Sequence, residues 1–368
     1  MDGTAHTLTP NWADHAGALD VPADGALLGV DTEFMRRNTF YPKLALVQVA
    51  HGDACWLVDP LAYPTAPDLR ALVGGRVCVM HSASEDLEAL APLLGDTALQ
   101  LFDTQIAAAL CGMGAGLSYQ KLVACVCHVD IPKDETRSDW LQRPLTPGQV
   151  VYAAQDVAYL GALHDALLDA LERRGRAAWH AEDCARLVER AHRNHTEIDA
   201  QPQRAFAAAS EWPIAAQARL QRVLLWRETT ARTLDRPRPW LLDDAHALQL
   251  AQQPPATAQE LFDRVKGQRA LRGAQRAELL VLLQAPVTPA DTAALQPIPP
   301  APHGAVKRAV AAMRDVVQTI AADLDLPAGL LCPRRLLEQF AVARTWPDDL
   351  AGWRAGLLRD KLTPLLPD

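Results

Sequence analysis

The 368-residue sequence contains no long hydrophobic run. No apolar stretch reaches 18 residues, and the first 25 residues lack a basic start followed by an apolar segment. A membrane-spanning helix needs about 20 consecutive apolar residues, and a secretory signal needs that basic start. We therefore expect neither a membrane span nor secretion, and we predict a cytoplasmic protein.

Cysteine is scarce and forms no ligand pattern. The chain has seven cysteines, an odd number scattered along its length, which favours reduced thiols over a disulfide framework. Cys125, Cys127 and His128 have the composition of a metal site, but C-x-C-H lacks the spacing and the fourth ligand of structural zinc. We therefore expect buried thiols there.

Basic charge is lacking in the N-terminal half. Residues 1–190 contain 14 Lys and Arg against 25 Asp and Glu, a net charge of −11, whereas residues 191–368 contain 22 against 19, a net charge of +3. Because local charge steers polyanions, the overall charge of −8 does not exclude nucleic acid as a partner. The carboxylate excess suits divalent cations.

Apolar runs predict a mixed sheet in the N-terminal half. ALLGV, LALVQVA and CWLVD read as three strands, the last two joined by the turn HGDA, so we expect an antiparallel meander. The strand VCVMH, a helix carrying Asp86, the strand LFDT and an alanine-rich helix near Gln105 then alternate, as in an α/β fold.

The segment TPGQVVYAAQDVAYLGALHDALLDAL predicts one helix. Thr146 stands at the cap position, proline follows in the first turn, and an apolar stripe runs from Val150 to Leu160. Beyond about residue 195 we expect only short helices. The proline-rich stretch from about 285 to 304 predicts a semi-rigid spacer rather than a helix.

Four acidic residues and one tyrosine predict a metal-dependent active site. Asp31 and Glu33 lie two apart at a strand end, so their side chains leave the same face. Tyr152 and Asp156 lie four apart on the predicted helix, so they share one helix face. Together with Asp86, these residues indicate a two-metal nuclease site.

Each of these residues also has an ordinary structural interpretation. Asp31 and Glu33 can form a solvated loop edge, Asp86 can favour a helix macrodipole, Asp156 can be an exposed helix position, and Tyr152 can simply pack. Their joint occurrence favours the active site.

The phrases around these residues resemble a known family. DTEF, HSASEDL and SDWLQRPLTPGQVVYAAQDVAYL are similar to the three exonuclease motifs of the DEDDy 3′–5′ exonucleases, most closely the ribonuclease D family, over residues 25–175. LQRVLLWRETTARTLDRPRPWLLDDAHAL resembles an HRDC domain, a small helical nucleic-acid-binding module, and LLCPRRLLEQF with GWRAGLL resembles a weaker second copy.

The resemblance implies an α/β ribonuclease-H-like (DnaQ-like) exonuclease domain with a mixed sheet, followed by two all-α HRDC-like helical domains. We expect the exonuclease domain at 1–195 and the helical domains at 211–285 and 303–368. The implied activity is a 3′–5′ exoribonuclease that trims structured RNAs, chiefly tRNA precursors, and releases nucleoside 5′-monophosphates. No obligate protein partner and no membrane are implied.

The resemblance also implies residue roles. Two divalent cations, Mg²⁺ or Mn²⁺, would be held by Asp31 as the bridging ligand, by Glu33 and Asp156 on the nucleophile side, and by Asp86 on the other side, partly through water. Tyr152 would orient the attacking water. Two alternatives stay open: a DNA exonuclease with the same motifs, and a nucleic-acid-binding protein whose nuclease domain is inactive.

Several further residues have two interpretations. Lys133, Arg137 and Arg143 flank the SDW phrase and can either grip the substrate backbone or belong to a solvated loop. Trp226 sits in an apolar run and is expected in the core. The arginines that follow it either contact nucleic acid or are exposed charges that keep the protein soluble; they are Arg227, Arg232, Arg236 and Arg238. His81 is expected to have a structural role.

Overall fold

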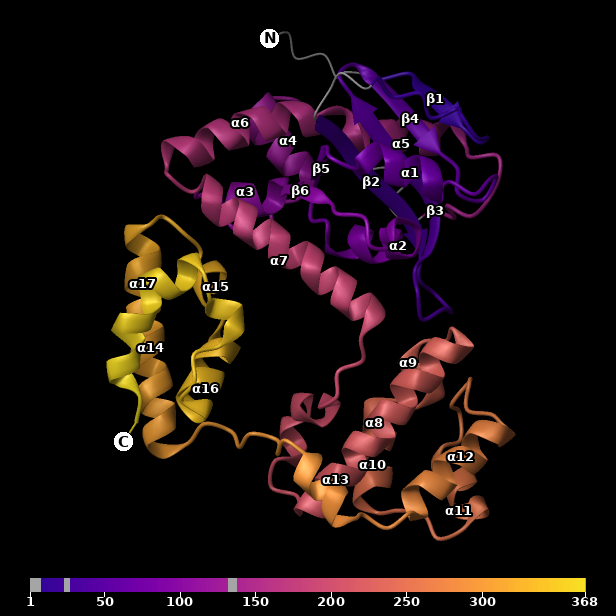
Figure 1. Cartoon of the computed structure of the whole chain (residues 1–368), viewed down its shortest axis with the longest axis vertical. Coiled ribbons are helices and arrows are strands. Elements are labelled where there is room, and N and C mark those ends of the chain that lie inside the picture. The colour runs from indigo at the N-terminus through magenta and orange to yellow at the C-terminus, as the bar shows by residue number, and fades with distance from the viewer. Residues whose placement is uncertain (1–7, 23–26, 132–137, 368) are drawn as a thin grey trace. The chain divides into compact units, whose positions relative to one another are not determined.

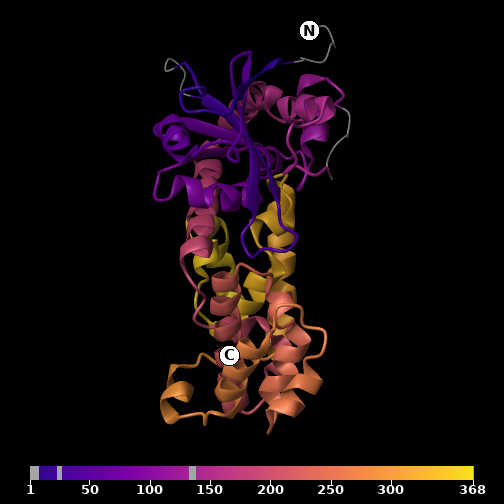
Figure 2. The same cartoon turned by 90° about the vertical axis from the view of Figure 1, so that its right-hand side faces the viewer.

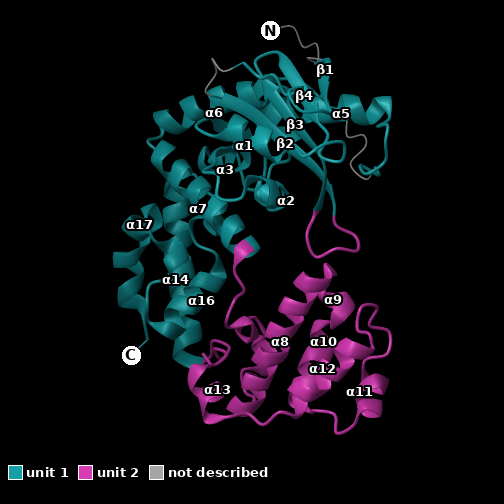
Figure 3. Cartoon of the chain, turned by 45° about the vertical axis from the view of Figure 1, so that its right-hand side comes forward, with its two compact units in different colours: residues 1–35, 43–195, 304–368 teal, residues 36–42, 196–303 magenta. Residues whose placement is uncertain are grey.

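A computed structural model describes residues 8–22, 27–131 and 138–367. The chain divides into two compact units, coloured separately in Figure 3. Unit 1 comprises residues 1–35, 43–195 and 304–368, and unit 2 comprises residues 36–42 and 196–303. Residues 304–368 therefore belong to the same unit as residues 43–195.

A six-stranded mixed sheet forms the centre of unit 1, with the strand order β1-β4-β3-β2-β5-β6. The strands are β1 (Pro10–Ala13), β2 (Leu27–Met35), β3 (Lys43–His51), β4 (Ala54–Val58), β5 (Val77–Met80) and β6 (Gln100–Asp103). Strands β2, β3 and β4 form the predicted antiparallel meander, whereas β5 and β6 continue the sheet in parallel. Strand β1, which pairs in parallel with β4, was not predicted.

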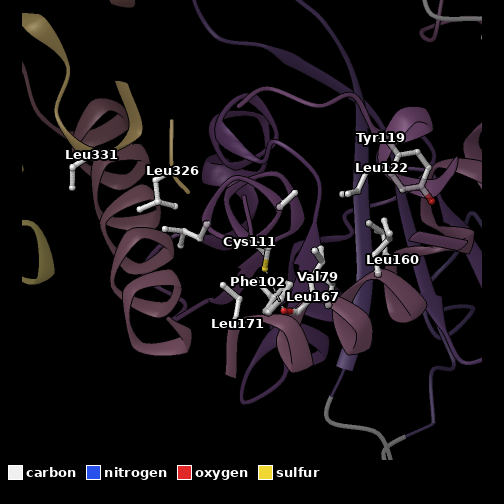
Figure 4. Packing of buried hydrophobic residues seen from close by; sticks show 14 of the residues in the cluster. Val79, Phe102, Cys111, Tyr119, Leu122, Leu160, Leu167, Leu171, Leu326 and Leu331 are labelled. Carbon is white, nitrogen blue, oxygen red and sulfur yellow. Dashed lines mark hydrogen bonds between the residues drawn. The ribbon is translucent and has the colours of Figure 1, made fainter. Parts of the chain in front are cut away.

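Helices cover both faces of this sheet. Helices α1 (Ala66–Val73) and α2 (Ser84–Leu94) pack with Val47 and Val49 on one face, and α5 (Pro147–Ala158) and α6 (Leu160–Arg173) pack with Leu46 and Leu57 on the other. Figure 4 shows part of the second core, with Leu167 of α6 beside Val79 and Phe102 of the sheet. Because side chains alternate between the two faces of each strand, they contribute to two hydrophobic cores, one on each face of the sheet. Two shorter helices, α3 (Thr104–Leu110) and α4 (Tyr119–Cys127), complete this region.

The predicted long helix is two helices. It begins as expected, with Thr146 and Gln149 forming a reciprocal capping box, but α5 ends at Ala158 and α6 starts at Leu160. The Tyr119 hydroxyl lies between the two, donating to the Gln155 carbonyl (3.0 Å) and accepting from the Tyr159 amide (3.1 Å). A side chain that enters the helical hydrogen-bond ladder interrupts the helix, and a residue 40 positions away is invisible to a local pattern.

The C-terminal segment docks on α7 (Ala177–Thr196) within unit 1. Its helices are α14 (Gly304–Asp323), α15 (Ala328–Leu331), α16 (Arg334–Ala343) and α17 (Trp353–Leu362), and Figures 1 and 2 both show them alongside α7. Trp353 stacks on Trp179 with ring centroids 4.5 Å apart. Gly112, at φ +80°, lies so close to Asp325 that any side chain there would clash.

Unit 2 consists of helices and the loops between them. It contains α8 (Ile214–Leu234), α9 (Arg238–Leu241), α10 (Asp244–Gln252), α11 (Ala258–Arg264), α12 (Gly273–Gln284) and α13 (Pro289–Ala294). The expectation of short helices is wrong for α8, with 21 residues, and for α14, with 20. The proline-rich stretch was expected to lack helix, yet α13 forms there because Thr288 and Asp291 make a capping box.

The same turn ends both long helices. Asp235 after α8 and Asp325 after α14 adopt positive φ (48° and 52°), and each is followed two residues later by the proline, Pro237 or Pro327, that starts a one-turn helix. The backbone bonds match as well, since Arg236 donates to Ala231 (3.0 Å) as Leu326 donates to Ala321 (2.8 Å). Two helical segments of the chain therefore share one local design.

Candidate metal centre

Strand β2 carries two carboxylates toward α5. Gly29 lies against Leu160 and the Val157 carbonyl, so Asp31 and Glu33, two and four residues further on, share that face. Asp31 pairs with Gln48 of β3, and Glu33 pairs with Leu46. The register shifts between Glu33 and Phe34, so the strand is irregular directly after the acidic pair.

Helix α5 brings a third carboxylate to the same place. Carboxylate oxygens of Asp31, Glu33 and Asp156 all lie within 4.8 Å of one another, close enough to share one ion. Tyr152, one turn before Asp156, is half-buried and contacts the Trp140 ring at a centroid distance of 5.9 Å. Three of the predicted acidic residues and the tyrosine therefore lie around one point.

Asp86 lies beside this group but outside the shared trio. It sits in the first turn of α2 and is buried, and its carboxylate accepts a hydrogen bond from the Thr32 hydroxyl at 2.5 Å. Thr32 was not identified from the sequence as part of the site. The feature that could have indicated it is the position of a polar residue between Asp31 and Glu33 on the predicted strand.

The four carboxyl groups of the cluster have raised pKa values. Burial raises the pKa of Glu33 to about 9, with further increases from Asp156 and Asp86. Burial raises the pKa of Asp156 to about 7 and that of Asp86 to about 6. The pKa of Asp31 also lies well above its usual range, through burial and the charges of Asp86, Asp156 and Glu33.

The donor set fits hard divalent cations. Over residues 8–22, 27–131 and 138–367, no lysine or arginine forms an ion pair with any of the four carboxylates. Oxygen ligands alone suit Mg²⁺ or Mn²⁺ rather than zinc or copper. A cation would offset the mutual repulsion that raises these pKa values.

Arg143 is an internal anchor. Its guanidinium donates to Asp59 (2.8 Å) and to the Ala45 carbonyl (2.6 Å), which ties the loop before α5 to the sheet. Arg143 therefore has a structural role, and both interpretations of it, contact with the substrate and a solvated loop, are wrong. Lys133 and Arg137 lie outside the described residues.

Other singled-out residues have structural roles. His81 contacts the Thr104 hydroxyl (2.9 Å) and the Leu117 carbonyl (3.0 Å), as expected of a structural histidine. All seven cysteines are free, but Cys125 is exposed and Cys127 is half-buried, so their expected burial is wrong. The prediction is wrong because α4 buries Tyr119, Leu122 and Val123 and leaves the two cysteines outside its buried face.

The candidate arginines of α8, of the turn after it and of α9 bond to groups within unit 2. Arg227 is buried and donates to the Leu242 carbonyl (3.1 Å) and to Asp244 (2.6 Å). Arg232 and Arg238 both pair with Glu228, and Arg236 donates to the Asn38 carbonyl at 3.2 Å. Trp226 packs against the core of unit 2, as expected.

Comparison with known proteins shows the family of the chain. Residues 15–172 match a family model described as 3′-5′ exonuclease. The chain is 41% identical over 366 residues to ribonuclease D of Xanthomonas oryzae pv. oryzae, covering 97% of this chain and 98% of that one. It is 37% identical to ribonuclease D of Pseudomonas paraeruginosa, over 89% of this chain and 88% of that one.

A solved structure extends the likeness to the whole fold. The crystal structure of Escherichia coli RNase D, described as an exoribonuclease involved in structured RNA processing, matches with a TM-score of 0.81 and 26% identity. The match covers 97% of this chain and 98% of that one.

The mixed sheet, its acidic cluster and the matched family model define a 3′–5′ exonuclease. The identity over nearly the full length then specifies the family. The chain belongs to the ribonuclease D family and is a 3′–5′ exoribonuclease. No helix in the described part of the chain has the length and apolar character needed to cross a bilayer.

Proposed function

We propose that this exoribonuclease hydrolyses RNA with two divalent metal ions held by Asp31, Glu33, Asp86 and Asp156. The observation that carries the proposal is the convergence of three carboxylates within 4.8 Å, in a region with raised pKa values. When bound, two such ions supply an activated water and stabilise the leaving 3′ oxygen. Asp31 would serve both ions, and Asp86 would serve the second ion, partly through water.

Tyr152 orients the attacking water. Burial and the neighbouring charges of Asp156, Glu33 and Asp31 raise the pKa of its phenol above its usual range. A phenol that keeps its proton cannot act as a base, so its hydroxyl positions the water by hydrogen bonding. The Trp140 ring beside it restricts its side-chain position.

The two helical segments act as HRDC-like modules for the RNA. Their shared turn at Asp235 and Asp325 supports two copies of one module. Because the Escherichia coli relative is described as acting in structured RNA processing, we propose that the substrates are folded RNAs with single-stranded 3′ ends, such as tRNA precursors, in the cytoplasm.

A surface of unit 2 has the chemistry for contacting RNA. Arg269 lies over the Trp240 ring at 5.1 Å, and Lys266 and Arg276 lie over the exposed Phe262 ring at 5.6 and 5.2 Å. Arg272 is exposed, and its carbonyl accepts from the Arg276 amide at 2.9 Å. We propose that these residues form one RNA-contacting surface, the cationic aromatic patch, which comprises Trp240, Phe262, Lys266, Arg269, Arg272 and Arg276. Aromatic rings can stack on unpaired bases while cations meet phosphates.

Digestion of labelled RNA tests the proposed function. A hairpin RNA with a single-stranded 3′ tail and its DNA counterpart, both 5′-labelled, are incubated side by side with Mg²⁺, Mn²⁺ or a chelator. We expect stepwise shortening of the RNA from its 3′ end, nucleoside 5′-monophosphate products, and no shortening with the chelator. Internal cuts, a preference for DNA, or activity in the chelator would contradict the proposal.

A further inference from the structure

Gln48 is a buried polar residue that has no hydrogen-bond partner in the described part of the chain. It lies at the centre of β3 with 0% of its surface exposed, in the predicted apolar run LALVQVA. Neither its amide nitrogen nor its amide oxygen hydrogen-bonds to any residue that the structure describes. Buried polar groups are nearly always paired, so this amide requires an explanation.

The sheet register places Gln48 directly beside the metal centre. Gln48 pairs with Asp31 across the antiparallel β2–β3 ladder and with Leu57 on its other side. Directly opposed residues project from the same face, and their Cβ atoms are about 4.5 to 5.5 Å apart. The amide of Gln48 is therefore within side-chain reach of the Asp31 carboxylate.

An apolar side chain would suit this position better for stability alone. The neighbours on the same face within β3 and β4, namely Leu46, Ala50 and Leu57, are apolar and belong to the core under α5. An unpaired buried amide costs about 1 to 3 kcal/mol. A leucine of similar volume would avoid that cost, so packing does not account for the glutamine.

We propose that Gln48 is a positioning residue of the metal centre, whose amide nitrogen donates a hydrogen bond to Asp31 when that carboxylate binds a divalent cation. Ligating carboxylates generally receive hydrogen bonds from neighbouring groups, which fix their orientation. Over the described residues, Gln48 is the unpartnered buried donor whose strand position faces Asp31. The inference rests on the proposed function, because it requires Asp31 to be a metal ligand.

Metal binding by Gln48→Leu tests this inference. Metal-free protein is titrated with Mn²⁺, and free Mn²⁺ is followed by electron paramagnetic resonance while Tm is measured without metal. We expect the Mn²⁺ dissociation constant to rise about 10- to 100-fold, which is typical for loss of such a supporting group. We also expect Tm without metal to stay the same or to rise, since the unpaired amide is gone.

Gln203→Leu is the matched control. Gln203 is equally buried but lies in unit 2, where its amide donates to Gln201 (2.9 Å) and to the Gln296 carbonyl (2.8 Å). Gln203→Leu should have a lower Tm than the wild-type protein and the same Mn²⁺ affinity. This is the opposite of the result expected for Gln48→Leu.

Two results would overturn the inference. One is wild-type Mn²⁺ affinity in Gln48→Leu, and the other is failure of both Gln48→Leu and Gln48→Met to fold, which would make the role structural. Failure of the proposed function looks different, because the wild-type protein itself would then bind no Mn²⁺.

Discussion

The guanidinium of Arg354 donates two hydrogen bonds to the carboxylate of Asp183, one of them 2.9 Å long. This pair joins α17 to α7, although the two residues are 171 positions apart in the sequence. Both side chains are almost fully buried, at 11% and 8% exposure. The Trp353 indole donates to the same carboxylate at 3.1 Å. The docking of the C-terminal segment therefore depends on one buried anion.

Removing one member of this pair should strongly destabilise the protein. Arg354→Ala leaves Asp183 buried without its counter-ion, which costs about 3 to 5 kcal/mol. Chemical denaturation measures the change in the free energy of unfolding. The double variant Arg354→Leu with Asp183→Leu should recover part of the loss, whereas a cost below about 1 kcal/mol for Arg354→Ala would mean that the pair behaves like a surface ion pair.

Tyr152→Phe should separate catalysis from metal binding. The hydroxyl positions water but holds no ion, so kcat should fall by about 100-fold or more while Mn²⁺ affinity is unchanged. Asp156→Asn is the comparison, because it should abolish turnover and weaken Mn²⁺ binding. Unchanged turnover in Tyr152→Phe beside an inactive Asp156→Asn would refute the role of the tyrosine.

The stability of the metal-free protein should fall as pH rises. The folded-state pKa values of Glu33, Asp156 and Asp86 are raised to about 9, 7 and 6. Unfolded carboxyl groups titrate near about pH 4, so the folded state binds more protons between about pH 4 and pH 9, and stability declines across that range.

Thermal melts in a chelator, from about pH 5 to pH 9, measure this decline. Glu33→Gln should flatten the upper part of the curve, because it removes the carboxyl group with the highest pKa of the three. Mg²⁺ should restore Tm most at high pH, where the carboxylates are ionised. The same pH dependence of Tm in Glu33→Gln and in the wild-type protein would contradict the prediction, because the decline would then come from groups other than Glu33.

Two arginines of the cationic aromatic patch should contribute to RNA affinity. Arg269 and Arg272 are exposed, and neither has an ion-pair partner among the residues described. Arg269→Ala with Arg272→Ala should weaken RNA binding and reduce the salt dependence of log K by about 0.7 for each lost phosphate contact.

Arg190→Ala with Arg193→Ala is the charge-matched control for the patch. Both residues are exposed on α7, outside the two proposed RNA-binding modules, and their loss changes the net charge equally. Fluorescence anisotropy at several salt concentrations compares the two double variants. Equal losses of affinity would indicate that overall charge, rather than the patch, attracts RNA.

Local features of the fold could be predicted from sequence, and distant contacts could not. The meander, the Thr146 cap and the shared face of Asp31 and Glu33 follow from strand alternation and capping chemistry. The break at Tyr159 could not be foreseen, because it depends on the hydroxyl of Tyr119.

The same limit applies to charged side chains. Arg143 and Arg227 looked like candidates for phosphate contact, yet each is bonded to a carboxylate, Asp59 or Asp244, that sequence does not bring near it. The docking of α17 on α7 likewise depends on partners 171 residues apart. Motif phrases could locate the candidate site, but not the side chains that support it.

Calorimetric titration of the metal-free protein with Mn²⁺, compared with Asp31→Asn, tests the central claim most directly. Asp31 faces Glu33 and Asp156 within 4.8 Å and is the proposed bridging ligand, so its carboxylate should be needed for both ions. We predict that the wild-type protein binds two Mn²⁺ ions and that Asp31→Asn, with its fold intact, binds neither tightly. Undiminished binding of Mn²⁺ by Asp31→Asn would contradict the account.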